Sequence, residues 1–161
     1  MGRISKVNYY LEIARTVAMR GTCLRRKFGA IIVKDDVIVS TGYAGAPRGR
    51  QNCCDLNFCL RDKMNIPRGE RYELCRSVHA EANAIIAAPR DRMLGATLYL
   101  ACVDPKTGDT VPGTCCCQMC KRLVINAGIE QVVVHEEGDG YTVYQVSDWI
   151  ENDDSLGQIG Y

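Results

Sequence analysis

The sequence predicts an α/β domain in which helices pack on the faces of a central mixed sheet. Segments with helical periodicity alternate with short β-branched runs along most of the chain. The two motifs richest in metal-binding side chains each open a predicted helix that follows a strand or a loop, on one side of the sheet. The length of 161 residues fits a single domain, residues 1–161, with a core of ordinary size.

The first third of the chain predicts a helix followed by a β-hairpin. Ser5 is a suitable helix cap, and apolar residues then recur at helical spacing until a stop near Gly21. The β-branched runs 28–33 and 37–41 are separated by a polar turn of three residues, which indicates a hairpin. The glycine-rich residues 42–49 lack the spacing of a phosphate-binding loop, so both a plain turn and a substrate-facing loop stay open.

The rest of the chain predicts two longer helices, three strands and a short last helix. The expected elements are a helix at 78–88 capped by Ser77, a strand at 96–103, a helix at 119–127 ending before Gly128, strands at 130–135 and 141–146, and a short helix around Trp149 capped by Ser147. We expect residues 151–161 to form a flexible, solvated tail.

Charge and hydropathy exclude several classes of protein. The chain has 20 basic and 19 acidic residues, and a net charge of +1 does not favour nucleic acid or a membrane surface as a partner. No apolar run has the length of a membrane span and no signal segment opens the chain. Gly2 does not fit a myristoylation motif, because Lys6 stands where Ser or Thr is needed. We therefore expect a cytoplasmic protein, in which clustered cysteines bind metal more often than they form disulfides.

Two short motifs offer ligands for a metal. His79 stands two residues before Glu81, and Cys117 is the one member of the run 115–117 with a cysteine, Cys120, three residues later. Three protein ligands leave one position of a tetrahedral zinc free for water, which is typical of a catalytic site. Residues two apart on a helix point to different sides, so Glu81 is expected to move protons for the bound water while His79 binds the metal.

Each motif also has a plainer interpretation. A C-x-x-C pair alone fits a redox pair or half of a structural zinc site, and His79 alone fits a core histidine. The two motifs in this order match the H-x-E…C-x-x-C pattern of zinc-dependent nucleobase deaminases. His135, the other histidine, has no predicted role.

A second metal is predicted in the polar segment 51–76, because an irregular loop of this length needs something to hold it. The preferred ligands of this structural zinc are Cys23, Cys53, Cys59 and Cys75, with Cys54 as the alternative to Cys53. The competing interpretation is a group of free, partly buried thiols.

Several longer stretches resemble a known family. They are Thr22-Cys23-Leu24-Arg25-Arg26 before Gly29-Ala30, Thr41-Gly42-Tyr43 with Gly45 and Pro47, and Cys75-Arg76 leading to His79-Ala80-Glu81 with Asn83-Ala84-Ile85. From about Ile4 to Trp149 the chain resembles the deoxycytidylate (dCMP) deaminase family, within the cytidine deaminase superfamily.

The resemblance implies a fold, an activity and cofactors. It implies a three-layer α/β/α cytidine-deaminase-like fold with a five-stranded mixed sheet, assembled into homo-oligomers. It implies hydrolysis of dCMP to dUMP and ammonia, with a catalytic zinc on His79, Cys117 and Cys120 and with Glu81 carrying protons. It further implies a second zinc in many members, and regulation by dCTP and dTTP in some.

Two positions depart from the family pattern. Ala44 stands where the family has an asparagine that contacts the sugar hydroxyl, and Cys116 replaces a proline before the first cysteine ligand. The substrate-binding candidates are Arg26 and Arg48, for a phosphate, together with Ala44 and Ala80. Open alternatives are a zinc deaminase of another small ring or nucleoside, such as cytidine, deoxycytidine or cytosine, and a non-catalytic, zinc-stabilised interaction protein.

Overall fold

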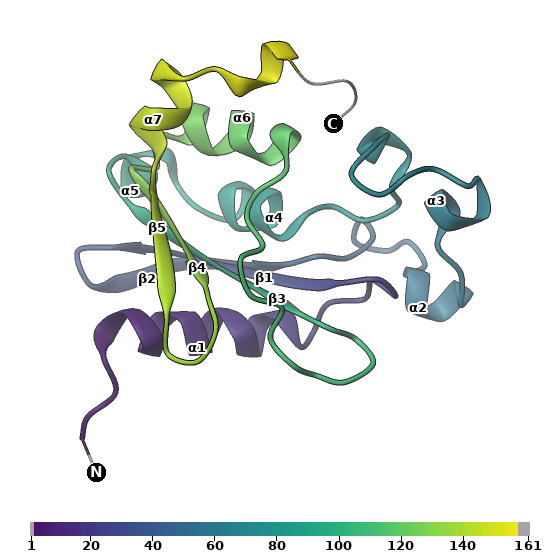
Figure 1. The fold of residues 1–161 in the computed structure, drawn as a ribbon, viewed down its shortest axis with the longest axis horizontal. Coiled ribbons are helices and arrows are strands. Elements are labelled where there is room, and N and C mark those ends of the chain that lie inside the picture. Colours follow the sequence, from purple (N-terminus) through teal and green to yellow (C-terminus); the bar gives the residue numbers. More distant parts are fainter. Residues whose placement is uncertain (1, 158–161) are drawn as a thin grey trace.

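The chain forms a mixed five-stranded sheet between two layers of helices, as the computed structural model of residues 2–157 describes it (Figure 1). The strands are β1 (Lys27–Lys34), β2 (Val37–Tyr43), β3 (Thr97–Val103), β4 (Gln131–His135) and β5 (Tyr141–Gln145), in the spatial order β2-β1-β3-β4-β5. β3 and β4 run parallel, and the other neighbouring pairs are antiparallel. The predicted α/β class, with a mixed sheet of five strands, is confirmed.

One face of the sheet is covered by a single helix, α1 (Lys6–Ala18). The Ser5 hydroxyl accepts a hydrogen bond from the Asn8 amide at 3.1 Å, which confirms the predicted cap. The buried face of α1 presents Leu11 and Ala14 to Ile31 and other apolar residues of the central strands. This layer lies on the side of the sheet away from the predicted metal motifs (Figure 1).

The opposite face carries the other helices and the larger core. The helices that contribute to this core are α4 (Ala80–Ile86), α5 (Arg90–Met93), α6 (Gln118–Ala127) and α7 (Val146–Glu151). Their buried residues, among them Ala84 and Val124, pack against Ile32, Leu98 and Val132 of the sheet. Both metal motifs therefore lie in one layer, at the beginnings of α4 and α6.

Glycines let both helical layers approach the sheet closely. A Cβ atom on Gly42 would overlap the Ala80 carbonyl and the Ala84 amide of α4. A Cβ atom on Gly29 would overlap backbone atoms of α1 on the other face. The absence of a side chain at Gly42 thus sets the height of α4, and with it of His79, above β2.

Three predicted features of the local structure are wrong. Val78 exchanges two backbone hydrogen bonds with Gly45, at 2.7 and 3.2 Å, so the chain stays extended there and His79, not Ser77, is the cap of α4. α7 likewise begins at Val146, directly after β5, so its cap is Gln145 and not Ser147. The segment expected to be irregular contains α2 (Cys53–Leu56), α3 (Leu60–Lys63) and the 3₁₀ turn η1 (Tyr72–Leu74).

The end of the chain is described as far as residue 157. It forms the 3₁₀ turn η2 (Asp154–Gly157), in which Asp154 lies 3.3 Å from the Lys121 ammonium and accepts from Gln118. Residues 158–161 lie outside the described part, and the predicted flexibility of residues 151–161 stays a prediction. Within residues 2–157, no helix combines the length and the apolar character needed to cross a bilayer.

Candidate metal centre and substrate cavity

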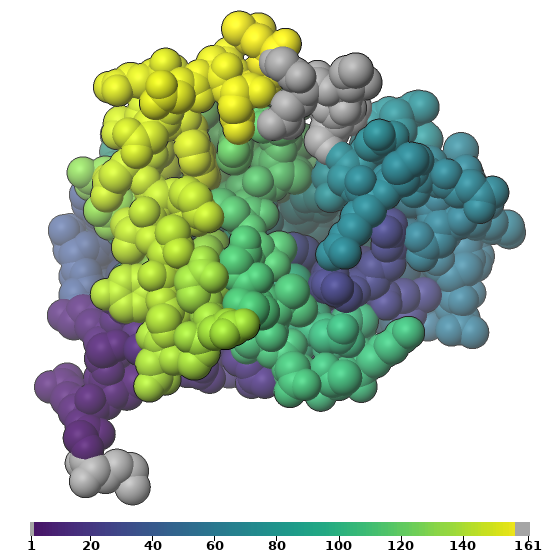
Figure 2. Space-filling view, viewed as in Figure 1, coloured from purple at the N-terminus to yellow at the C-terminus, as the bar shows by residue number. Residues whose placement is uncertain are grey.

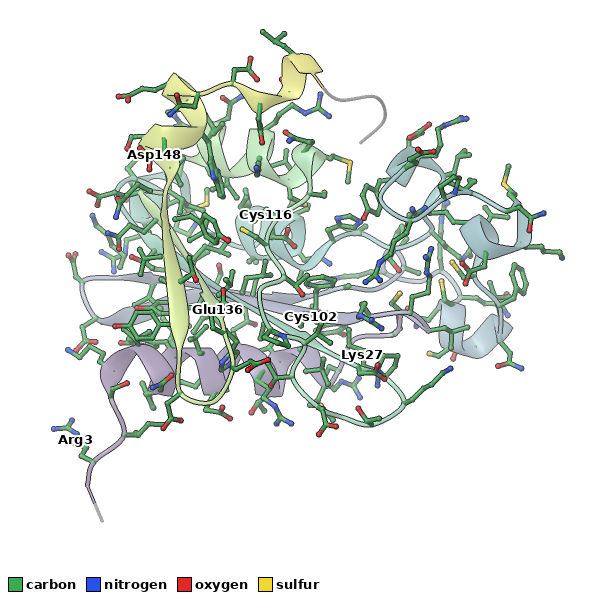
Figure 3. The ribbon with its side chains drawn as sticks, in the orientation of Figure 1. Arg3, Lys27, Cys102, Cys116, Glu136 and Asp148 are labelled. Carbon is green, nitrogen blue, oxygen red and sulfur yellow. The ribbon has the colours of Figure 1, made fainter. Side chains whose placement is uncertain are left out.

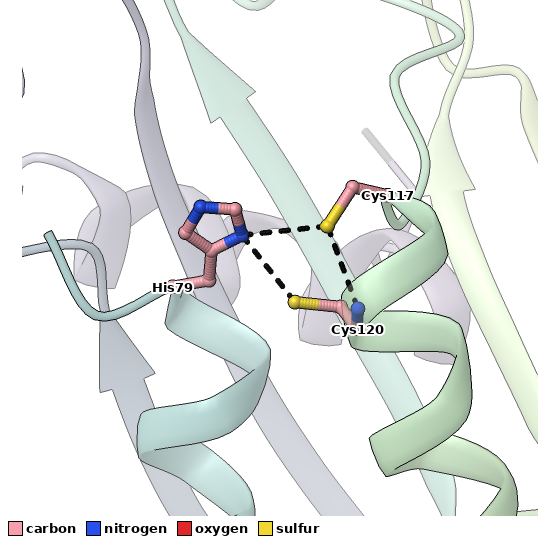
Figure 4. A group of neighbouring side chains, drawn as sticks. All are labelled: His79, Cys117 and Cys120. Carbon is pink, nitrogen blue, oxygen red and sulfur yellow. Dashed lines mark hydrogen bonds between the residues drawn. The ribbon is translucent and has the colours of Figure 1, made fainter. Parts of the chain in front are cut away.

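Two neighbouring helix N-termini form the candidate metal centre (Figure 4). His79 is the cap of α4, and Cys117 is the cap of α6. The Cys117 sulfur accepts a hydrogen bond from the Cys120 amide at 3.4 Å, which is the local reason why α6 begins at this cysteine. A helix N-terminus also stabilises a thiolate, the form of cysteine that binds metal.

The three predicted ligands converge on one point. The Nδ1 atom of His79 lies 3.5 Å from the Cys117 sulfur and 3.4 Å from the Cys120 sulfur, and all three donor atoms lie within 4.8 Å of one another (Figure 4). Zn–N and Zn–S bonds of about 2.1 and 2.3 Å at a tetrahedral angle require an N···S distance of about 3.6 Å. The arrangement therefore fits a zinc ion with three protein ligands.

Glu81 is the buried acid of the centre. Its side chain is 3% exposed and lines the same cavity as His79. Burial raises the pKa of the Glu81 carboxyl, although the charge of His79 acts in the opposite direction. A carboxyl in such a position can accept and release the proton of a water bound to the metal.

The ligands also influence one another electrostatically. The hydrogen bond with Cys120, helped by His79, lowers the pKa of the Cys117 thiol to about 4 although burial acts in the opposite direction. Burial lowers the pKa of His79, but hydrogen bonds with Cys117 and Cys75 outweigh it and raise this pKa to about 10. These shifts favour the thiolate form of Cys117, the form that binds a metal, and binding of a divalent cation would favour neutral His79.

A cavity of about 560 Å³ opens over these residues. Its wall is formed by residues within 23–28, 53–81 and 104–117, and it includes His79, Ala80 and Glu81. The indigo segment near residue 25, the teal segment near residues 60–75 and the green loop after β3 adjoin one another in the space-filling view (Figure 2). The volume is within the range of small-molecule sites.

The structure brings three of the four predicted substrate-binding residues to this cavity. Arg26, Ala44 and Ala80 line it, whereas Arg48 is exposed and does not. Arg26 donates from Nη1 to the Arg25 carbonyl at 2.8 Å, and its buried Nε atom has no partner among the described residues. This nitrogen is a donor available to an anion in the cavity.

Ala44 offers no hydrogen bond to a ligand. Its amide donates to the Phe28 carbonyl at 3.1 Å, and its carbonyl accepts from the Thr22 amide at 3.0 Å. The methyl side chain is therefore what Ala44 contributes to the cavity wall. A sugar hydroxyl at this point would receive no polar contact from residue 44.

The four cysteines predicted to bind a second metal all line the cavity. The Cys23 sulfur accepts from the Arg25 amide at 3.4 Å, and burial raises the pKa of Cys53, with further contributions from Cys23, Cys75 and Cys59. Among the described residues, no three of these four sulfurs lie within 4.8 Å of one another, in contrast to the donors around His79. The alternative ligand, Cys54, is exposed and faces Asp55 at 3.9 Å.

Two further cysteines lie deeper in the molecule. Figure 3 shows Cys116 in the helical layer and Cys102 at the level of the sheet. Both are buried, and none of the ten cysteines forms a disulfide. Hydrogen bonding to Cys115 and burial raise the pKa of Cys116, so this residue, which replaces the family's proline, is a neutral core thiol.

Sequence reasoning missed an aromatic contact on the histidine ligand. The Tyr72 ring stands edge-on to the His79 ring, with centroids 5.1 Å apart. The Arg61 guanidinium lies over the Tyr72 ring, 4.4 Å from its centroid. Arg61 and Tyr72 lie eleven positions apart in a segment without periodicity, and no signal in the sequence pairs them.

A family model and several curated proteins match the chain. The model of the cytidine and deoxycytidylate deaminase zinc-binding region matches residues 4–136. The deoxycytidylate deaminase of Mycobacterium phage D29 is 37% identical over 142 residues, which are 85% of this chain and 99% of that protein. The deoxycytidylate deaminase of Schizosaccharomyces pombe is 33% identical over 128 residues, which are 80% of this chain and 36% of that protein. The chain thus spans about a third of the length of the fungal relative.

Solved structures share the fold. The dCMP deaminase of cyanophage S-TIM5, in complex with dCMP and dUMP, superposes with a TM-score of 0.56 at 22% identity and covers 98% of this chain and 96% of its own. The cytidine deaminase of Mycobacterium tuberculosis gives a TM-score of 0.51 at 17% identity, over 92% of this chain and 97% of its own. These similarities establish the three-layer architecture.

Proposed function

Because the chain belongs to the cytidine and deoxycytidylate deaminase family, we propose that it is a zinc-dependent hydrolase that converts dCMP to dUMP and ammonia. The observation that carries the proposal is the convergence of His79, Cys117 and Cys120 beside the buried Glu81, at the wall of a cavity of about 560 Å³. The relatives from phage D29 and Schizosaccharomyces pombe are both deoxycytidylate deaminases, which supports dCMP as the substrate.

Four residues share the chemistry. His79, Cys117 and Cys120 would hold the zinc, which when bound supplies an activated water to the substrate's C4. Glu81 takes a proton from this water, gives it to ring N3, and afterwards carries a proton to the leaving amine. The low exposure of Glu81 excludes bulk water, so that the proton stays between the carboxyl and the substrate.

The polar end of the nucleotide would lie away from the metal. Arg26 lines the cavity with a free buried donor, and a guanidinium suits a phosphate because two of its N–H groups can point at two oxygens. Ala44 contributes no polar contact to the sugar. We therefore propose that the base and the phosphate, more than the sugar hydroxyl, determine binding. The predicted phosphate contact of Arg48, which does not line this cavity, stays a prediction.

Ammonia release from zinc-loaded protein tests the proposed function. The protein is offered dCMP, CMP, deoxycytidine, cytidine and cytosine separately, and we expect dCMP to be turned over with the highest kcat/KM. Glu81→Gln keeps the size of the side chain and should lower kcat at least about a hundredfold with zinc still bound. Turnover of another ring in place of dCMP would reject the substrate, and full activity of Glu81→Gln would reject the role of Glu81.

We further propose a second, structural zinc held by Cys23, Cys53, Cys59 and Cys75. This proposal is supported by four thiols that line one cavity. In addition, Cys23 and Cys75 each accept a hydrogen bond from the backbone amide of the residue two positions later, as metal-bound thiolates often do. Such an ion would fasten the segment 51–76 to the start of β1.

Assembly, regulation and location stay predictions from the resemblance. Large apolar side chains are exposed on α4, α6 and α7, with Ile86 77%, Leu123 40% and Ile150 60% exposed. Their presence in one helical layer supports the expected homo-oligomer. The dCTP and dTTP effectors and the cytoplasmic location rest on the resemblance and the sequence alone.

A further inference from the structure

The cavity wall carries more basic than acidic side chains. Its basic residues are Arg25, Arg26, Arg61, Arg68, Arg76 and Lys106, and its acidic residues are Asp62, Glu81 and Asp104. Arg25 and Arg26 form ion pairs at 3.3 and 3.5 Å, and Arg76 donates to a backbone carbonyl at 2.7 Å. The side chains of Arg68 and Lys106, in contrast, are exposed and form no hydrogen bond or ion pair among residues 2–157.

Arg68 is presented by a braced turn. The Glu70 amide donates to the Pro67 carbonyl at 3.2 Å, and Gly69 has the positive φ of 84° that a type II turn requires at this position. Arg61, which is 5% exposed, donates to the Glu70 carbonyl at 2.7 and 3.1 Å and to the Pro67 carbonyl at 3.4 Å. A buried guanidinium therefore holds both ends of the turn that carries Arg68.

Arg68 and Arg26 both line the cavity. Arg26 belongs to the segment before β1, and Arg68 to the loop between α3 and η1. Burial raises the pKa of the Cys102 thiol on β3 to about 11, and the charges of both arginines oppose this shift. Two cations from separate loops therefore lie in the wall of one cavity.

We propose that Arg68 is a second anchor for the phosphate of the substrate, together with Arg26, and that it makes the enzyme prefer a nucleoside monophosphate over the nucleoside. This proposal rests on the proposed function, because it assumes a cytosine nucleotide in the cavity. An arginine fits the role better than Lys106, since its planar fork donates to two phosphate oxygens from one fixed turn.

Two measurements on the same variants test the anchor. Arg68→Ala should raise KM for dCMP about tenfold or more, with kcat unchanged and with the same kcat/KM for deoxycytidine as the wild type. Calorimetry should show the same loss of affinity for dUMP, and no loss for deoxyuridine. Arg68→Lys should restore part of the affinity. The control is Arg122→Ala, which removes an exposed arginine of α6 that does not line the cavity.

Three outcomes would overturn the anchor. The first is an unchanged affinity of Arg68→Ala for dUMP. The second is an affinity for deoxyuridine that falls as much as the affinity for dUMP. The third is a larger loss of dUMP affinity in Lys106→Ala than in Arg68→Ala. If the wild type does not deaminate dCMP, the proposed function fails by itself, and the dUMP and deoxyuridine titrations still decide the role of Arg68.

Discussion

At the scale of single residues, hydrogen bonds to Asp36 link the first helix to the tip of the hairpin. The Tyr10 hydroxyl on α1 donates to the Asp36 carboxylate at 2.5 Å, and Lys6 pairs with the same carboxylate at 3.0 Å. Asp35 and Asp36 both have positive φ, so the turn that exposes this acceptor is itself an uncommon conformation. Burial, followed by the bond to Asp36, raises the pKa of Tyr10 to about 12.

This shift predicts a loss of stability at alkaline pH. An unfolded tyrosine ionises near pH 10, whereas folded Tyr10 stays protonated until about pH 12. Its contribution to the free energy of unfolding is therefore complete below pH 10 and is lost as pH rises toward 12. Tyr10→Phe should cost about 1 kcal/mol at pH 7 and progressively less above pH 10.

Urea unfolding at a series of pH values measures this difference. Tyr9→Phe is the control, because the neighbouring Tyr9 is 48% exposed and its substitution should change the free energy little at any pH. If the loss of unfolding free energy caused by Tyr10→Phe stays constant up to pH 11.5, ionisation of the Tyr10 hydroxyl does not reduce the stability of the fold and the prediction is wrong.

Residues of the candidate centre differ in how far the sequence could predict them. The group of His79, Cys117 and Cys120 follows from ligand type and spacing, which zinc geometry restricts strongly. Arg68 and Tyr72 could not be predicted, because their positions depend on Arg61, whose partners lie across an aperiodic loop. Arg48 was chosen because it lies near a predicted pocket loop, but it does not line the cavity.

At the scale of elements, the height of α4 above the sheet controls the candidate centre. α4 begins at the ligand His79 and contains Glu81, and it crosses β2 over Gly42. α1, on the other face, crosses Gly29 with an equally close backbone contact and carries no residue of the centre. A substitution at Gly29 is therefore expected to change the stability of the fold alone. A substitution at Gly42 is expected to change both the stability and the positions of the metal ligands.

Alanine substitutions at Gly42 and Gly29 test this difference. Gly42→Ala and Gly29→Ala should each lower the free energy of unfolding by about 1–3 kcal/mol, because a helix backbone must move away from the new methyl group. Gly42→Ala alone should also weaken zinc binding, measured by competition with a chelator. Equal zinc affinities of the two variants would contradict the coupling between α4 and the metal.

The longer elements could be predicted from periodicity, whereas the short ones could not. α1 and α6 show apolar residues at helical spacing, β1, β2 and β4 show β-branched runs, and β3 is a largely apolar run. Helices α2, α3 and α5 have four residues each, too few for a period. The start of α4 was misplaced because a long-range bridge between Gly45 and Val78 holds the chain extended, and no local pattern reports such a bridge.

At the scale of the whole molecule, the two metal sites would join segments that are distant in sequence. The centre at His79 links the N-termini of α4 and α6, which lie 38 positions apart in the chain. The proposed cysteine site would link the start of β1 to α2 and to the residues before α4. A metal that binds the folded chain alone adds its binding free energy to the stability of the fold.

We therefore expect the thermal stability of the chain to fall when it binds fewer zinc ions. We expect about two zinc ions per chain by atomic emission. Cys59→Ser should retain about one ion and lower Tm by roughly 5–10 °C, because the segment 51–76 loses its link to β1. Cys54→Ser is the matched control, since Cys54 is exposed and does not line the cavity, and it should keep both ions.

Cys120→Ser should lose the other ion together with activity. A wild-type content of one ion that Cys59→Ser leaves unchanged would instead show that the four thiols bind no metal. The turn held by Arg61 would then be sufficient to order the loop beside the candidate centre.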